Sequence, residues 1–223
     1  MRSNQSAPMS EQKIKVLRIA SCDRSGSTVV GNILGSGANF FHGGEIHHVW
    51  GRGLIGNWLC GCGHPFRNCD LWTGVLEEAF GGADRVDAHS MANLRRVTYS
   101  QQNRLLAFSS EGRRHLQATL SAYLENLDKL YRAIQSRTGA KAIVDFSKTA
   151  VHGWLLTMLP AIDLHLLHLV RDARGVAYAL GKKKLHLGDP EQRYMARHGP
   201  WKSSRMWLRD NLAIESLSSS LAG

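Results

Sequence analysis

One feature restricts the fold of this 223-residue chain more than any other: an apolar run that leads directly into a short polar loop and a second apolar run. Residues 13–21 are rich in Ile, Val and Leu and predict a strand, while residues 28–34 predict a helix that ends at a glycine-rich stretch. The first N–H groups of a helix lack intrahelical acceptors, and the helix dipole is positive there. A strand, a loop and a helix N-terminus in this order predict a site for a phosphate-like anion.

The rest of the chain alternates between strand-like and helix-like segments. Leucines recur every three or four residues over 113–137, which predicts one long helix closed by Gly139. Residues 37–70 are rich in glycine and histidine and predict mostly loop with one short helix. Further strands are expected at 141–146 and 162–170, and further helices at 71–80, 151–159, 174–180 and 206–217. This alternation predicts an α/β fold, a three-layer domain over residues 13–223 with a central parallel sheet.

Charge and composition limit the classes of partner and compartment. The formal net charge is +10, and residues 171–209 hold ten Lys or Arg against three Asp or Glu, which suggests an anionic ligand or partner. No apolar run approaches the roughly 20 residues that span a bilayer. Residues 1–12 are polar and predict a flexible tail without a secretory signal. Four cysteines are too few for a disulfide scaffold at this length, so we expect a cytoplasmic protein.

Three loops that follow the predicted strands are the candidate ligand contacts, because α/β proteins bind ligands beyond the carboxyl ends of their strands. They are 22–28, 147–149 and 171–174. In the first loop Arg24 can clamp an anion, and Ser27 and Thr28 can donate hydroxyls. The loop lacks the lysine of a Walker A motif, which disfavours an ordinary nucleoside triphosphatase. A helix cap followed by a turn is the structural alternative for this loop.

Several segments together resemble the sulfotransferases that use 3′-phosphoadenosine-5′-phosphosulfate (PAPS). Arg24-Ser25-Gly26-Ser27-Thr28, with Gly44-Glu45 some twenty residues further on, resembles the family's 5′-phosphosulfate loop. Residues 168–179 resemble its 3′-phosphate motif: Arg171 matches the arginine, but Ala179 stands where the family has a serine. Residues 144–148 and 60–72 resemble a strand end and a cysteine-bearing loop of the bacterial branch. The resemblance implies a P-loop-like fold over most of the chain.

The resemblance also implies roles for individual residues. PAPS would serve as the sulfonate donor, held by one set of residues: Arg24, Ser25, Gly26, Ser27, Thr28, Ser147, Arg171 and Arg174. Glu45 is expected to take the proton of the acceptor hydroxyl, with His47 or His48 as the alternative base. Lys148 would stabilise the leaving group together with Arg24. No metal is expected, because Arg and Lys can neutralise the charge that develops in such a transfer.

The acceptor and the activity stay open at the level of sequence. A small molecule, a lipid or a carbohydrate could present the hydroxyl, in a pocket formed by loops within 40–70 and 84–112. The family usually continues through another strand and a basic segment, whereas this sequence ends at Gly223, so the resemblance implies a shortened member. The alternatives are a degenerate, non-catalytic nucleotide-binding protein and an atypical P-loop kinase. A nucleic-acid-binding module would rest on charge alone, and no specific nucleic acid is expected.

Four potential soft metal ligands lie in one glycine-rich stretch: Cys60, Cys62, His64 and Cys69. Zinc accepts such a set, but the Cys-x-Cys-x-His spacing is tighter than the common ones. The spacing therefore favours a packing role or a covalently closed loop. Cys22, by contrast, follows the first predicted strand and is expected to be a small buried side chain.

Overall fold

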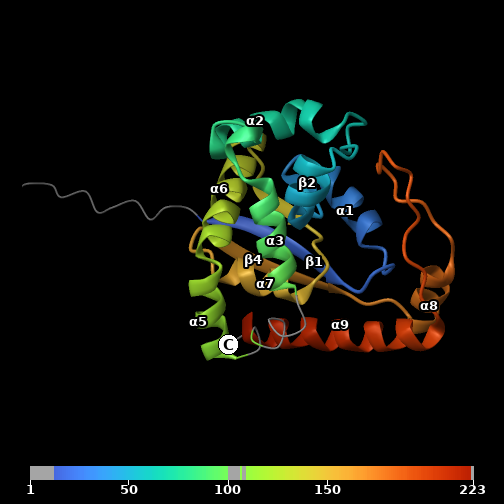
Figure 1. Ribbon diagram of the computed structural model, residues 1–223. Helices are drawn as coiled ribbons and strands as arrows, with labels where there is room; N and C mark the ends of the chain where they lie inside the picture. Colours follow the sequence, from blue (N-terminus) through green and yellow to red (C-terminus); the bar gives the residue numbers. More distant parts are fainter. Residues whose placement is uncertain (1–12, 100–105, 107–108, 222–223) are drawn as a thin grey trace, which may run out of the picture.

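A four-stranded parallel sheet lies at the centre of the protein (Figure 1). The structure, a computed structural model, describes residues 13–99, 106 and 109–221, and the predicted tail at 1–12 lies outside these residues. The strand order is β2-β3-β1-β4, and the strands are β1 (Ile14–Ser21), β2 (Phe40–Gly44), β3 (Ala142–Asp145) and β4 (Ile162–Leu169). The prediction of an α/β fold with a central parallel sheet is confirmed.

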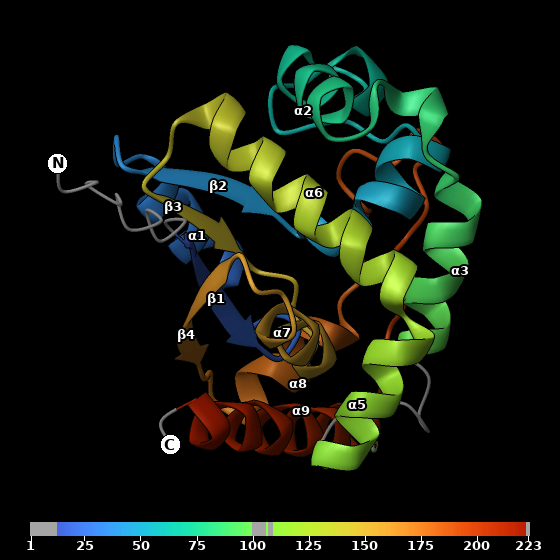
Figure 2. The ribbon, with the colours of Figure 1, turned by 90° about the vertical axis from the view of Figure 1, so that its left-hand side faces the viewer.

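Helices cover both faces of this sheet, because alternate residues of each strand point to opposite sides. On one face, Ile19 and Val144 are buried under α1 (Ser27–Gly35). On the other face, Ile14, Val16 and Ile143 belong to the main core, which is completed by α6 (Ser121–Thr138), α7 (Ala150–Thr157) and α9 (Pro200–Leu221). Figure 2 shows α6 running obliquely across the sheet, with α7 and α9 below it.

The connections that leave the two central strands, β1 and β3, run toward opposite edges of the sheet. From β1 the chain passes through α1 to β2, whereas from β3 it passes through α7 on the other face to β4. In α/β sheets such a reversal creates a crevice beyond the carboxyl ends of the two strands, where ligands usually bind. The loops that leave β1 and β3 therefore lie at the position in the fold that is best suited to a ligand.

The remaining helices surround this core. They are α2 (Asp70–Phe80), α3 (Ala88–Thr98), α5 (Ser110–Thr119) and α8 (Ala173–Gly181). Between β2 and α2 the chain forms a 3₁₀ turn (Ile46–His48), a π-helical turn (Val49–Ile55) and a second 3₁₀ turn (Phe66–Asn68), and a third follows α2 (Ala83–Arg85). Among the described residues, no helix combines the length and the apolar character needed to cross a bilayer.

Two sequence-based predictions of local structure are wrong. The predicted helix at 113–137 is divided at Leu120 into α5 and α6. Thr119 bonds back to the His115 carbonyl oxygen at 2.9 Å, a contact that tends to bend helices. The region 37–70 contains strand β2, whose Phe-Phe-His-Gly-Gly sequence carries a weak strand signal because glycine lacks a side chain to pack.

Two other helices differ from the sequence-based prediction: α3 was not expected, and α9 is longer than expected. Helix α3 lies inside 84–112, where loops are expected from the sequence, and Asp87 caps it by accepting a hydrogen bond from the Ser90 N–H at 2.9 Å. Helix α9 begins at Pro200 rather than near residue 206, which agrees with the preference of proline for the first helical turn. Both cap signals were present in the sequence.

Candidate functional site

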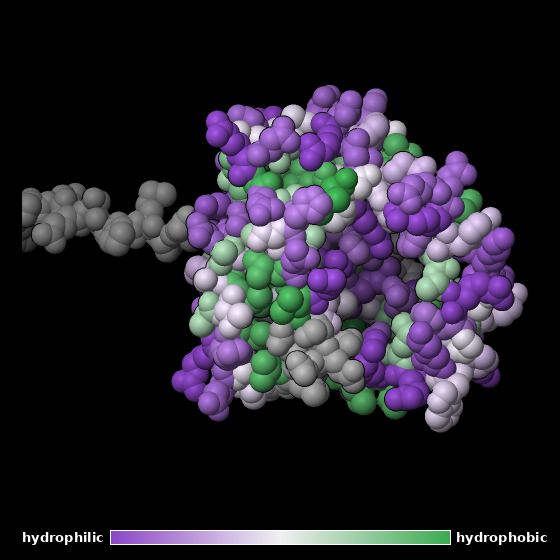
Figure 3. All heavy atoms as spheres, viewed as in Figure 1, coloured by the Kyte–Doolittle hydropathy of each residue, from purple (hydrophilic) through white to green (hydrophobic). Residues whose placement is uncertain are grey.

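A cavity of about 890 Å³ opens beyond the carboxyl ends of β1 and β3. Its walls include Arg24, Glu45, His47 and Lys148, the four residues that the sequence suggested for catalysis. Figure 3 shows this face of the molecule hollowed between the main body and the segment 182–199, with hydrophilic side chains around the hollow. The fold thus brings together residues from four separate stretches of the chain.

The loop after β1 leads into helix α1 with two residues in the left-handed conformation. Arg24 has φ 65° and Gly26 has φ 98°, a region that glycine adopts freely and arginine rarely does. The N–H groups of Val29 and Val30 both donate to the Gly26 carbonyl oxygen, at 3.0 and 3.2 Å, so the helical bonding begins there. The N–H groups of the residues between Gly26 and Val29 are then those that lack an intrahelical acceptor.

The hydroxyl residues of this loop lie apart from the cavity wall. Ser25 and Ser27 are buried, and the Ser25 Oγ has no hydrogen-bond partner among the described residues. Thr28 is exposed on the first turn of α1. Within this loop the cavity wall is formed instead by Asp23 and Arg24, and Arg24 Nη2 contacts the Met195 sulfur there.

Arg171 follows β4 and reaches the same loop. Its Nη1 donates to the Arg24 carbonyl oxygen at 2.9 Å, and its own carbonyl oxygen accepts a hydrogen bond from Trp207 Nε1 at 2.8 Å. The two predicted anion motifs are thus in direct contact, although Arg171 itself is exposed and does not line the cavity. The carboxyl ends of β1 and β4 are neighbours in the sheet, which explains the meeting.

A network of ion pairs centred on Glu45 forms one wall of the cavity. Glu45 Oε1 lies 2.9 Å from Lys148 Nζ, and Glu45 Oε2 lies 3.0 Å from Arg52 Nη1. Lys148 Nζ also lies 3.3 Å from Asp23 Oδ1. Burial lowers the pKa of Lys148, but the two carboxylates more than offset this effect and raise it overall, so Lys148 is a cation at neutral pH. Glu45 is thus held between a lysine and an arginine.

The Lys148 turn rests on a fully buried polar cluster. Asp145, the last residue of β3, accepts hydrogen bonds from the Ser147 N–H at 2.7 Å and the Ser147 Oγ at 2.6 Å. Ser147 Oγ in turn accepts the His47 N–H at 3.1 Å. Ser147 is therefore buried and holds the turn in place, and it does not line the cavity, where it was expected to contact the nucleotide.

Arg18, which the sequence analysis overlooked, supports the same turn from β1. It is buried, lies opposite Asp145 in the register of β1 and β3, and donates from Nη2 to the carbonyl oxygens of Ser147 (2.6 Å) and Thr149. The Asp145 carboxylate also accepts a hydrogen bond from Tyr131 at 2.7 Å. Burial raises the pKa of Asp145, but its hydrogen bonds and the nearby Arg18 lower it overall to about 2.

The two adjacent histidines lie deep in the cavity wall. Burial lowers the pKa of His47 well below its usual range, and the neighbouring His48 and Arg95 lower it further. Burial likewise lowers the pKa of His48 to about 2, with help from Arg52. Both rings are thus neutral near pH 7, and their centroids are 3.9 Å apart. Because burial disfavours the protonated ring, His47 is a weak proton acceptor and is less suited than Glu45 to the role of base.

Arg174, by contrast, lies away from the cavity. Its side chain is 92% exposed and its Nη2 pairs with Asp172 Oδ2 at 2.8 Å. It borders a second hollow beside α8 together with Lys182, whose Nζ lies over the Tyr178 ring at 4.2 Å. Arg174 and Lys182 therefore do not replace, within the cavity, the serine of the 3′-phosphate motif that is Ala179 in this chain.

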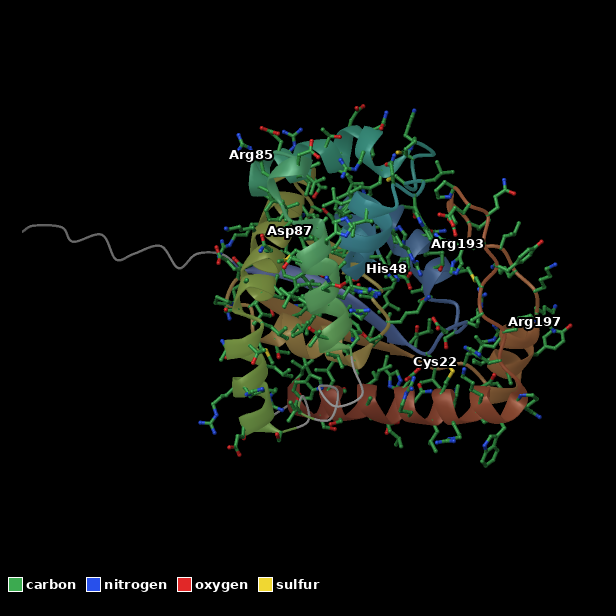
Figure 4. All side chains as sticks on the ribbon, in the orientation of Figure 1. Cys22, His48, Arg85, Asp87, Arg193 and Arg197 are labelled. Atoms are coloured by element: carbon green, nitrogen blue, oxygen red, sulfur yellow. The ribbon has the colours of Figure 1, made fainter. Side chains whose placement is uncertain are left out.

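The segment 182–199 supplies part of the cavity that the sequence did not indicate. It folds back on itself, with Leu185 bridged to Tyr194, and it places His186, Met195 and His198 on the wall. Figure 4 labels His48 on the main body, and Arg193 and Arg197 on this segment across the hollow. Arg52 was missed as well, because it lies in a glycine-rich stretch without a recognisable motif.

Comparison of the chain with protein-family models, with curated proteins and with solved structures finds no match.

Proposed function

We propose that this protein is a sulfotransferase that moves a sulfonate group from PAPS to an acceptor hydroxyl, with a P-loop-like nucleotide site. The observation that carries the proposal is the convergence of Arg24, Lys148 and Glu45 on one cavity, with Arg171 bonded to the Arg24 loop. An anion clamp, a cation that can neutralise a leaving group and a carboxylate that can accept a proton are the groups that this reaction requires.

The size and the charge of the cavity fit the proposed donor. A volume of about 890 Å³ lies within the range of roughly 300–1,000 Å³ that is typical of ligand sites. Arg24, Arg52, Lys148 and Arg209 supply positive charge to the walls, and Trp154 and Leu180 supply apolar surface. A nucleotide with several negative charges and a planar base needs both kinds of wall. Arg171, at the edge, would meet the 3′-phosphate.

Each residue would have a separate task in the reaction. PAPS supplies an activated sulfonate when it is bound. Arg24 and the first N–H groups of α1 hold the anionic end, and Lys148 stabilises the negative charge that develops on the departing oxygen. Glu45 accepts the proton of the acceptor hydroxyl, for which it must part from Lys148 or Arg52. The acceptor itself would be a small molecule, a lipid or a carbohydrate.

Isothermal titration calorimetry with adenosine 3′,5′-bisphosphate tests the nucleotide site. The wild-type protein should bind this ligand more tightly than ATP with magnesium, and Arg24→Ala should lose most of the affinity. Arg85→Ala is the matched control, because Arg85 is an exposed arginine outside the cavity wall. Binding of ATP with magnesium in preference to the bisphosphate would favour a kinase and overturn the proposal.

A binding protein without transferase activity is the second candidate, and the specific observation in its favour is Ala179 with Arg174 turned outward. Transfer of radiolabelled sulfonate from PAPS to a panel of hydroxyl acceptors separates the two. The proposed enzyme labels at least one acceptor in a protein-dependent manner. Tight binding of the bisphosphate without any labelling would instead support the non-catalytic alternative.

A further inference from the structure

Three free thiols meet at one point beside the candidate site. The Sγ atoms of Cys60, Cys62 and Cys69 all lie within 4.8 Å of one another, and this is the one such group found over residues 13–99, 106 and 109–221. Thiolates that bind a tetrahedral zinc ion at about 2.3 Å lie about 3.8 Å apart. Small side-chain rotations are therefore enough for the three sulfur atoms to share one ion.

The backbone around these residues forms a tight turn of the kind that presents sulfur to a metal. The Gly63 N–H donates to the Cys60 carbonyl oxygen at 2.9 Å, and the Cys60 N–H donates to the His64 carbonyl oxygen at 2.8 Å. Gly63 has φ 88°, so the turn requires glycine there. The backbone N–H groups of Cys62 and His64 also donate to the sulfur atoms of Cys60 and Cys62, respectively, so the turn orients these two sulfur atoms.

A fourth donor, the exposed His64, lies next to one of the three thiols. The His64 side chain hydrogen-bonds the Cys62 sulfur, and Cys69 arrives from the N-terminus of α2. We propose that Cys60, Cys62, His64 and Cys69 bind one structural Zn²⁺ ion. Three thiolates and one imidazole form a closed tetrahedral set for this ion, and the three thiols release their protons to solvent as it binds. The spacing favoured packing, but the folded turn brings the donors together.

A disulfide is the competing use of these cysteines, and their odd number disfavours it. Any disulfide within the group joins two sulfur atoms and leaves the third thiol unpaired. The exposure of the group is also graded: Cys69 is buried, Cys60 is intermediate and Cys62 is exposed. An ion can therefore enter from the solvent side at Cys62 and be held by the buried Cys69.

The ion would fix one wall of the cavity. The Leu59 N–H, next to Cys60, donates to the Gly188 carbonyl oxygen at 2.9 Å, and the Trp58 ring contacts the His186 ring with centroids 5.4 Å apart. Both partners lie on the segment 182–199, which also carries Met195 against Arg24. A metal that rigidifies the turn would hold this segment over the candidate site. The inference does not depend on the proposed function.

Elemental analysis and cobalt titration test the site directly. Protein purified under reducing conditions should contain one equivalent of zinc. After zinc is removed with a chelator, one equivalent of Co²⁺ should restore the spectrum of a tetrahedral site, with thiolate-to-cobalt charge transfer in the near ultraviolet. Cys62→Ser should lose about one third of that charge-transfer intensity, because two of the three thiolates remain. His64→Ala should keep the charge transfer and shift the visible bands.

Cys22→Ala is the matched control, because Cys22 is buried against Val176 and Leu180, away from the cluster. Its cobalt spectrum should equal that of the wild type. Absence of zinc and of cobalt binding in folded, reduced wild-type protein would overturn the proposal, and this result requires no variant to fold. A cobalt spectrum that is unchanged in Cys62→Ser, or a disulfide among the three cysteines after purification under reducing conditions, would also overturn it.

Discussion

The guanidinium of Arg171 donates to the backbone carbonyl oxygen of Arg24 at 2.9 Å, across 147 positions of the sequence. The contact joins the loops after two neighbouring strands, β1 and β4, and it supports the left-handed backbone of Arg24. A ligand that binds Arg24 therefore also encounters the charge of Arg171.

Arg171 should determine the preference for a 3′-phosphate. We expect Arg171→Ala to weaken the binding of adenosine 3′,5′-bisphosphate by about 10- to 100-fold, since hydrogen bonds to charged groups contribute about 1.5–3 kcal/mol. Adenosine 5′-monophosphate, which lacks the 3′-phosphate, should lose less. Calorimetry with both ligands measures the ratio. An equal loss for both would mean that Arg171 acts only by holding the Arg24 loop.

Glu45 should separate catalysis from binding. We expect Glu45→Gln to lower sulfonate transfer by about 10²- to 10⁴-fold, the usual contribution of a general base. The affinity for adenosine 3′,5′-bisphosphate should stay the same or rise, because Lys148 and Arg52 lose a competing carboxylate. Radiolabel transfer and calorimetry on the same preparation report the two effects. Glu78→Gln, an exposed change on α2, serves as the control and should leave both unchanged.

Asp145 should be essential for the stability of the Lys148 turn. Asp145→Asn removes the negative charge that offsets the charge of the buried Arg18, and leaving a buried charge uncompensated costs about 3–5 kcal/mol. Urea denaturation followed by circular dichroism measures the change. Asp163→Asn removes a carboxylate from an exposed pair with His165 and should cost less than about 1 kcal/mol. Similar costs for the two variants would contradict the buried cluster.

The buried histidines should make folding stability depend on pH. Burial lowers the pKa values of His47, His48 and His152 in the folded protein, so the unfolded chain binds protons first. Their contribution is present above about pH 6.5 and is lost as the pH falls below it, by at most about 1.4 kcal/mol per pH unit for a histidine that takes up its proton only in the unfolded chain. Urea midpoints at pH 7.5 and 5.5 should reveal this loss. The slope should be unchanged in His89→Gln, because His89 is exposed.

Gly153 should tolerate no side chain. A Cβ at this position would meet Leu217 of α9 and lie 2.9 Å from Arg18 Nη1, so both of these buried side chains would have to shift. We expect Gly153→Ala to destabilise the protein by about 1–3 kcal/mol, as overpacked cores do. Thermal unfolding measures the shift in Tm. Gly181→Ala, where a Cβ meets nothing within 4 Å, should remain close to the wild type.

The sequence predicted the parts of the molecule that follow local rules. Apolar runs placed β1, β3 and β4 within one or two residues, and the loops after them pointed to Arg24, Lys148 and Arg171. Parallel topology alone brings such loops to one edge of a sheet, so their proximity could be expected before the structure. Glu45 was indicated by a motif rather than by any periodicity.

The parts that were missed depend on contacts between distant segments. Arg18 reads as one polar residue within a strand, and only its position opposite Asp145 explains its burial. The proximity of Arg52 to Glu45 arises from the π-helical turn that carries Arg52. The second wall of the cavity, at 182–199, has no strong local pattern. The burial of Ser147 likewise follows from its partners in three elements.

The ion pairs of Glu45 have a consequence for selectivity among anions. Lys148 and Arg52 already have an internal counterion, so an incoming anion must displace a carboxylate of the protein before it gains their charge. Small inorganic ions offer too few additional contacts to compensate for that exchange, whereas a large ligand with an aromatic ring and two anionic ends can. On the proposed function, the protein would then bind its nucleotide in preference to inorganic phosphate and sulfate.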